Sequence, residues 1–130
     1  MNTMKSHSAG LSRIFNAIRY SIKGLKSAWQ HEAAFRQEVY CFALLAPATV
    51  ALRLPGSHTV ILLALMGLVL ATELLNSALE AIVDMVSPEF HPLAGRAKDC
   101  GSAAVMVMVL VLVGAWSAWA GPALWYLLTR

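Results

Sequence analysis

Two long apolar runs, residues 59–85 and 102–128, constrain this chain more than any other feature of its sequence. Each run is long enough to supply the roughly 20 residues that an α-helix needs to cross the hydrocarbon core of a bilayer. Only 13% of the 130 residues are charged, whereas about a quarter are charged in an ordinary soluble domain. The chain is therefore predicted to be an all-α membrane protein with a single domain, residues 1–130.

Residues 11–30 are predicted to form an amphipathic helix on the membrane surface. Apolar residues recur there at steps of three and four, and basic and polar residues occupy the opposite face. Such a helix lies in the interface with its cations toward anionic headgroups. Residues 1–10 are polar, and no short apolar core with a cleavage site follows them, so no signal peptide is predicted. We expect these residues to form a disordered tail.

A first membrane span is predicted at residues 33–54, joined to the second span by a turn at Pro55 and Gly56. Six of the ten Lys and Arg precede the apolar part of this span, and two more lie between the second and third spans. The positive-inside rule then places the N-terminus and the second connection in the cytoplasm. The first turn and the C-terminus are expected outside.

The cytoplasmic half of the second span carries three acidic residues, Glu73, Glu80 and Asp84. Steps of seven and eleven return to within about 20° of the same direction on a helix, so the three form one stripe with Asn76 and Ser77. A carboxylate that faces lipid costs several kcal/mol. The stripe is therefore predicted to face the interior of a bundle or a subunit interface.

The depth of these carboxylates predicts different roles for them. Glu73 and Glu80 are about 10 Å apart along the helix axis, too far to share one ion. Glu80, near the aqueous interface and level with Glu32, suits a Mg²⁺ that keeps its waters and binds phosphates. Glu73 lies deeper and suits a general base. Lys98 and Asp99 open the third span at the level of Glu80, where a lysine can bind a polyphosphate.

Two other interpretations of the stripe remain open at this point. It could be a polar seam between helices, or it could line an ion or proton pathway. The sequence has no P-loop, kinase glycine-rich loop, HExxH, GxSxG or GxGxxG motif, and no nucleic-acid partner is expected.

Three segments resemble the prokaryotic diacylglycerol kinase family of small integral membrane enzymes: "EAAFRQE" (32–38), "ELLNSALEAIVD" (73–84) and "GRAKDCGSAAV" (95–105). The resemblance covers about residues 12–113. It implies a homotrimer in the bacterial inner membrane, with one surface helix and three transmembrane helices in each chain. It also implies transfer of the γ-phosphoryl group of MgATP to diacylglycerol, giving phosphatidic acid. Undecaprenol, the acceptor of a close relative within the family, is the alternative.

The resemblance also implies roles for individual residues. Glu32 and Glu80 would hold Mg²⁺, and Glu73 would be the base that faces the lipid hydroxyl. The ATP site would comprise Arg13, Tyr20, Glu32, Asn76, Glu80, Glu89, His91, Lys98 and Asp99. The lipid substrate would contact Arg13, Ala17, Ile18, Arg19, Tyr20, Ser21, Ile22, Trp29, Ala34, Phe35, Arg36, Gln37, Glu38, Glu73 and Ser102. The loop at 87–93 departs from the family pattern at Phe90 and Pro92.

Overall fold

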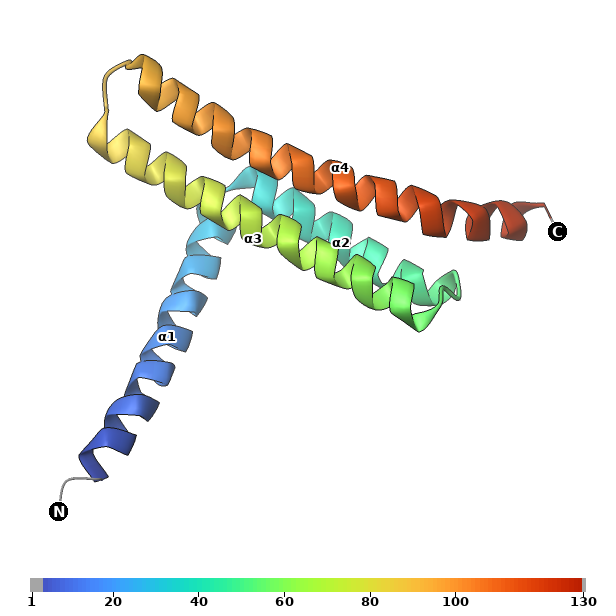
Figure 1. Ribbon diagram of the computed structural model, residues 1–130, viewed down its shortest axis with the longest axis horizontal. Coiled ribbons are helices and arrows are strands. Elements are labelled where there is room, and N and C mark those ends of the chain that lie inside the picture. The colour runs from blue at the N-terminus through green and yellow to red at the C-terminus, as the bar shows by residue number, and fades with distance from the viewer. Residues whose placement is uncertain (1–3, 130) are drawn as a thin grey trace. The chain divides into compact units, whose positions relative to one another are not determined.

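The computed structural model describes residues 4–129, with side chains from residue 10 onward, and every regular element in this range is an α-helix (Figure 1). The helices are α1 (Met4–His31), α2 (Ala33–Ala51), α3 (Gly56–Val86) and α4 (Pro92–Leu128). They divide into two compact units, one ending at Ala33 and the other beginning at Ala34. The prediction of an all-α fold is confirmed for the described residues.

Helix α1 forms the first unit and starts earlier than the sequence pattern suggested. The helix begins at Met4, where we expected a disordered tail up to residue 10, and residues 1–3 lie outside the described range. No proline interrupts residues 4–10, and one glycine lowers helix stability without ending the helix. The apolar face of α1 is exposed, including Phe15, Ile18 and Ile22. An uncovered apolar face of this kind is typical of a helix that lies on a membrane surface.

Helix α2 ends at Ala51, three residues before the predicted end of the first span. Arg53 has a positive φ of 53°, and its amide donates to the carbonyl of Val50 at 2.9 Å. The amide of Leu54 donates to the carbonyl of Thr49 at 3.1 Å. These two hydrogen bonds around a left-handed residue form a Schellman motif, which ends a helix by satisfying its last carbonyls.

The connection between α3 and α4 is shorter than expected. We expected residues 87–101 to be a loop, but only Ser87–His91 are non-helical, and α4 begins at Pro92. Proline suits the first turn of a helix because its fixed φ is helical and no amide hydrogen is needed there. The preceding His91 caps the helix, since its Nδ1 accepts a hydrogen bond from the amide of Leu93 at 3.2 Å.

Helices α3 and α4 form a hairpin with an apolar core (Figure 1). Leu62, Met66 and Val69 of α3 and Leu112 of α4 form the buried cluster. Partly buried residues of α2 also pack against this cluster, namely Phe42, Leu45 and Ala46. The core thus links all three helices of the second unit. At the end of the hairpin away from the connection between α3 and α4, His58 stacks on Trp119 with ring centroids 4.5 Å apart.

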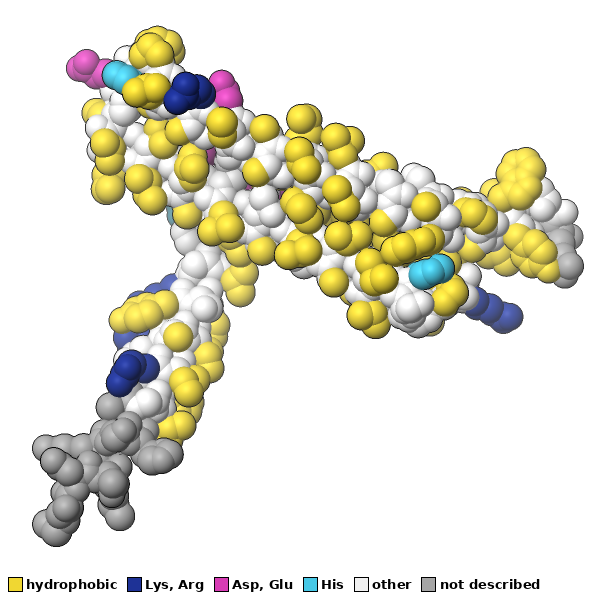
Figure 2. Space-filling model, viewed as in Figure 1, with side chains coloured by type: hydrophobic (Ala, Val, Ile, Leu, Met, Phe, Trp, Pro, Cys, Tyr) yellow, Lys and Arg dark blue, Asp and Glu magenta, His cyan; other side chains and the backbone are white. Residues whose placement is uncertain are grey.

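Apolar side chains also cover much of the outer surface of α3 and α4 (Figure 2). Among the described helices, these two are long and apolar enough to cross a membrane. Helix α2, predicted as the first span, is not one of them: its 19 residues are enough in length, but the polar run Arg36–Glu38 in its first turns lowers its hydropathy. The count of three spans therefore remains a prediction.

Candidate functional site

The acidic stripe of α3 runs from a buried end to an exposed end. Glu73 is only 5% exposed, Glu80 is half-buried, and Asp84 is exposed. The hydroxyl of Ser77 donates to the carbonyl of Glu73 at 3.0 Å, so it is satisfied within the helix. The three carboxylates therefore differ in burial within the protein, and their depth in a membrane stays a prediction.

Asn76 connects the stripe to the opposite helix. Its Nδ2 donates to Oε1 of Glu80 at 3.1 Å, and its buried Oδ1 has no hydrogen-bond partner among the described residues. This oxygen lies against Gly101 of α4, so close that an added Cβ at Gly101 would overlap it. The absence of a side chain at Gly101 therefore determines where Asn76 lies, and Asn76 in turn orients Glu80.

At the exposed end of the stripe, Lys98 of α4 forms a salt bridge with Asp84 of α3. The side chains are 36% and 64% exposed, respectively. Lys98 lies outside the predicted span 102–128. Its hydrogen bond to Asp84 raises the pKa of the Lys98 ammonium group, so this group stays protonated. Glu80 also attracts this ammonium. The structure thus brings the predicted phosphate-binding lysine to the predicted metal-binding carboxylate.

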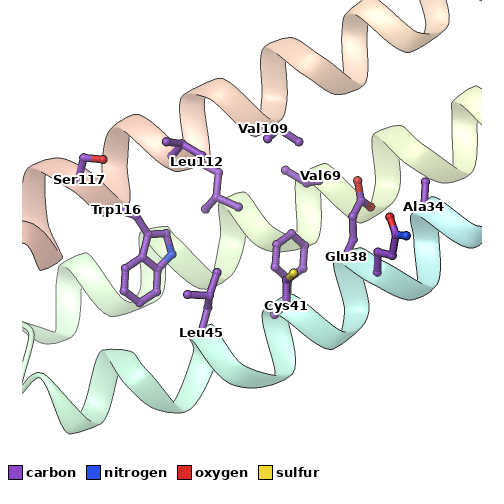
Figure 3. Close-up of a pocket in the computed structure, with 12 residues that line it drawn as sticks. Ala34, Glu38, Cys41, Leu45, Val69, Val109, Leu112, Trp116 and Ser117 are labelled. Carbon is purple, nitrogen blue, oxygen red and sulfur yellow. The ribbon is translucent and has the colours of Figure 1, made fainter.

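Glu38 of α2 approaches the buried end of the stripe. Its carboxylate interacts electrostatically with that of Glu73, and its Oε2 is buried with no hydrogen-bond partner among the described residues. Figure 3 shows the Glu38 side chain extending from α2 toward α3. The family resemblance implied that Glu38 contacts the lipid substrate, and the sequence gave no sign of its approach to Glu73, which depends on the packing of α2 on α3.

A cavity of about 470 Å³ lies beside Glu38 (Figure 3). Residues of α2, α3 and α4 line it, and most are apolar, as at Cys41, Val69 and Leu112. Trp116 also lines it, with an indole nitrogen that is buried and has no hydrogen-bond partner among the described residues. The cavity can accept an apolar chain, and its polar groups are few.

The predicted metal ligands lie in different units. Glu32 belongs to the first unit and is half-buried, whereas Glu80 belongs to the second. Within the described residues, no group of three or more His, Cys, Asp or Glu is arranged to hold a metal ion. Glu80 by itself still fits a Mg²⁺ ligand, because this ion commonly binds through one or two carboxylates and keeps several waters. The hydrogen bond from Asn76 also orients Glu80 as an outer partner orients a metal ligand.

The other predicted contacts have different surroundings. Glu89, His91, Asp99 and Ser102 are exposed around the start of α4, and the Nδ1 of His91 is occupied by the helix cap. Phe35 is buried, and Arg36 is half-buried. The remaining predicted contacts on α1 and α2 are exposed: Arg13, Ala17, Ile18, Arg19, Tyr20, Ser21, Ile22, Trp29, Ala34 and Gln37. The Arg19 guanidinium lies 5.4 Å from the centre of the Tyr20 ring.

Sequence reasoning missed Gly101 and left Asp84 without a role. One signal was present, since Gly101 lies three residues after Lys98 and therefore on the same face of its helix. That this face meets the stripe follows only from the packing of α3 on α4.

Comparisons with known proteins identify the family of this chain. The family model described as "Prokaryotic diacylglycerol kinase" matches residues 19–119. The diacylglycerol kinase of Escherichia coli strain K12 is 44% identical over 113 residues, which cover 87% of this chain and 93% of that protein. The diacylglycerol kinase of Pseudomonas aeruginosa is 45% identical over 108 residues, covering 83% and 88%. That of Haemophilus influenzae is 41% identical over 107 residues, covering 82% and 91%. This chain is an integral membrane protein that belongs to the prokaryotic diacylglycerol kinase family.

Proposed function

We propose that this protein is an ATP-dependent lipid kinase that transfers the γ-phosphoryl group of MgATP to the hydroxyl of diacylglycerol, giving phosphatidic acid. The observation that carries this proposal is the gradient of burial along the α3 stripe, from Glu73 to Asp84. A phosphate donor comes from water and a lipid alcohol from the membrane. A row of carboxylates that crosses from exposed to buried surroundings is a place where the two can meet.

The residues then divide the chemistry by depth. Glu73 accepts the proton of the lipid hydroxyl, whose oxygen attacks the γ-phosphorus while ADP leaves. Lys98 binds the phosphates at the exposed end, with Asn76 and Asp99 beside it. Glu32 and Glu80 would hold Mg²⁺, which supplies charge neutralisation on the phosphate oxygens. Phosphoryl transfer depends mainly on positioning and electrostatic stabilisation, so a small helical protein can perform it without a nucleotide-binding fold.

The remaining contacts are proposed from the family resemblance. Arg13, Tyr20, Glu89 and His91 would contact the nucleotide. The exposed face of α1 and the first turns of α2, together with Ser102, would contact the lipid. The apolar cavity beside Glu38 supports this assignment, because an acyl chain could occupy it with its polar end toward Glu73.

The proposed topology has three spans, at 33–54, 59–85 and 102–128, in the inner membrane of a bacterium. The N-terminus and the connection after α3 would be cytoplasmic and the C-terminus outside, as the distribution of Lys and Arg predicts. We propose a homotrimer from the family resemblance. Chemical cross-linking in membranes and light scattering in detergent would measure the number of chains.

The test of the reaction is an assay of purified protein in mixed micelles with γ-labelled ATP, offering diacylglycerol and undecaprenol in parallel. We expect label in phosphatidic acid, and only with a divalent cation present. Preferred labelling of undecaprenol would mean that the lipid acceptor is undecaprenol instead of diacylglycerol, while the proposed phosphoryl transfer from ATP would stand. Transfer to neither lipid, together with ion flux in vesicles, would instead favour a channel that uses the same stripe.

A further inference from the structure

The salt bridge between Asp84 and Lys98 joins α3 to α4 beside the stripe. Asp84 lies one helical turn beyond Glu80, and Lys98 lies three residues before Gly101, which contacts Asn76. The two contacts are therefore successive steps along the same seam between the helices. The ammonium of Lys98 is held at the end of the carboxylate row instead of extending into solvent.

An unpaired lysine at this position would be poorly defined. Its four-carbon chain gives the ammonium many rotamers, and fixing them when a ligand binds costs affinity. An ammonium has three hydrogens to donate, so a bond to Asp84 leaves others for phosphate oxygens. A partner that limits the rotamers beforehand lowers the entropy lost on binding, because the lysine is already ordered.

We propose that Asp84 is a positioning residue that holds Lys98 in place to bind the phosphates of ATP. This inference rests on the proposed function, which assigns those phosphates to Lys98. The inference gives a role to Asp84, since Glu80 is the proposed metal ligand and Glu73 the proposed base. Two other roles predict different outcomes. If Asp84 competes with the nucleotide for Lys98, its removal should strengthen nucleotide binding, and if the pair only joins the helices, its removal should lower stability alone.

The test is a double-mutant cycle on nucleotide affinity, measured by calorimetry in detergent with the Mg²⁺ complex of β,γ-imido-ATP. Exposed ion pairs contribute little, so Asp84→Asn is expected to weaken binding by about two- to fivefold. In the Lys98→Met background the same change should have no further effect, because the lysine that Asp84 positions is gone. Asp84→Glu keeps the charge and should recover part of the affinity.

The KM for MgATP distinguishes the two roles, because a purely structural role of Asp84 would leave this KM unchanged. We expect Asp84→Asn to raise KM for MgATP by a similar factor and to leave kcat and the KM for the lipid nearly unchanged. An interaction that is equally strong before and during the reaction has this effect. Thermal unfolding of each variant, followed by circular dichroism, would test whether the folded state is retained.

Several outcomes would overturn the inference. Tighter nucleotide binding by Asp84→Asn would mean that Asp84 competes for Lys98. An equal loss of affinity with and without Lys98 would mean that Asp84 acts through another residue, and unchanged affinity would remove it from the site. Failure of the proposed function has a separate signature, because the unmodified protein would then neither bind the nucleotide nor label the lipid.

Discussion

Gly101→Ala tests the contact between α3 and α4 more directly than a change in any charged residue. A Cβ added at Gly101 would overlap Oδ1 of Asn76, and it would lie 3.3 Å from the Asn76 Cγ and 3.6 Å from Cδ2 of Leu79. The backbone of α4 at Gly101 cannot shift away from Asn76 unless the whole helix moves. The Asn76 side chain must therefore rotate, and its 3.1 Å hydrogen bond to Glu80 is lost.

The size of the effect follows from two opposing contributions. Replacing a glycine by alanine within a helix usually stabilises it by about 1 kcal/mol. Losing a hydrogen bond to a charged group costs about 1.5–3 kcal/mol. The variant should therefore be destabilised by about 0.5–2 kcal/mol relative to the unmodified protein. Loss of an outer partner of a metal ligand typically weakens metal affinity about 10- to 100-fold, so the Mg²⁺ dependence should shift by at least about tenfold.

The assay is kinase activity against Mg²⁺ concentration, with unfolding measured on the same samples. Gly114→Ala is the matched control, because it lies in the same helix and an added Cβ there meets nothing within 4 Å. We expect this control to keep its activity and to be as stable as the unmodified protein or more so. If Gly101→Ala matches the control in both measurements, Asn76 does not orient Glu80 through this contact.

Three further predictions concern single side chains. Glu73→Gln should still bind MgATP but transfer phosphate at least about a hundredfold more slowly, and full activity in lipid micelles would remove Glu73 from the role of base. Glu80→Gln should raise the Mg²⁺ concentration needed for half-maximal activity, and an unchanged titration would argue against the metal assignment. Leu62→Ala should cost about 2–5 kcal/mol of unfolding free energy, since Leu62 is fully buried. Leu63→Ala, at a 43% exposed position, is its control, and equal losses in the two would contradict the observed core.

The sequence predicted the helices well because their signals are local. Residues 59–85 and 102–128 are mostly apolar, and both lie within observed helices. The amphipathic pattern of residues 11–30 likewise lies within α1. Helix ends were predicted less well. The starts of α1 and α4 were placed too late because polar residues were taken as signs of non-helical structure, and Pro92 was not recognised as the first residue of a helix.

The candidate site was predictable along one helix but not between helices. Helical periodicity alone places Glu73, Asn76 and Glu80 on one face, and the structure adds that this face becomes more exposed toward Asp84. Residues 95–105 suggested Lys98, but the sequence could not say which carboxylate Lys98 approaches.

By itself, the amino-acid sequence determined the apolar helices, the stripe of carboxylates and the family, because periodicity, composition and motif spacing are properties of one continuous segment. Only the tertiary structure decided that Asp84 pairs with Lys98, that Asn76 lies against Gly101 and that Glu38 approaches Glu73. These contacts depend on the register at which the helices pack. A shift of one turn would replace every partner while leaving the pattern of each helix unchanged.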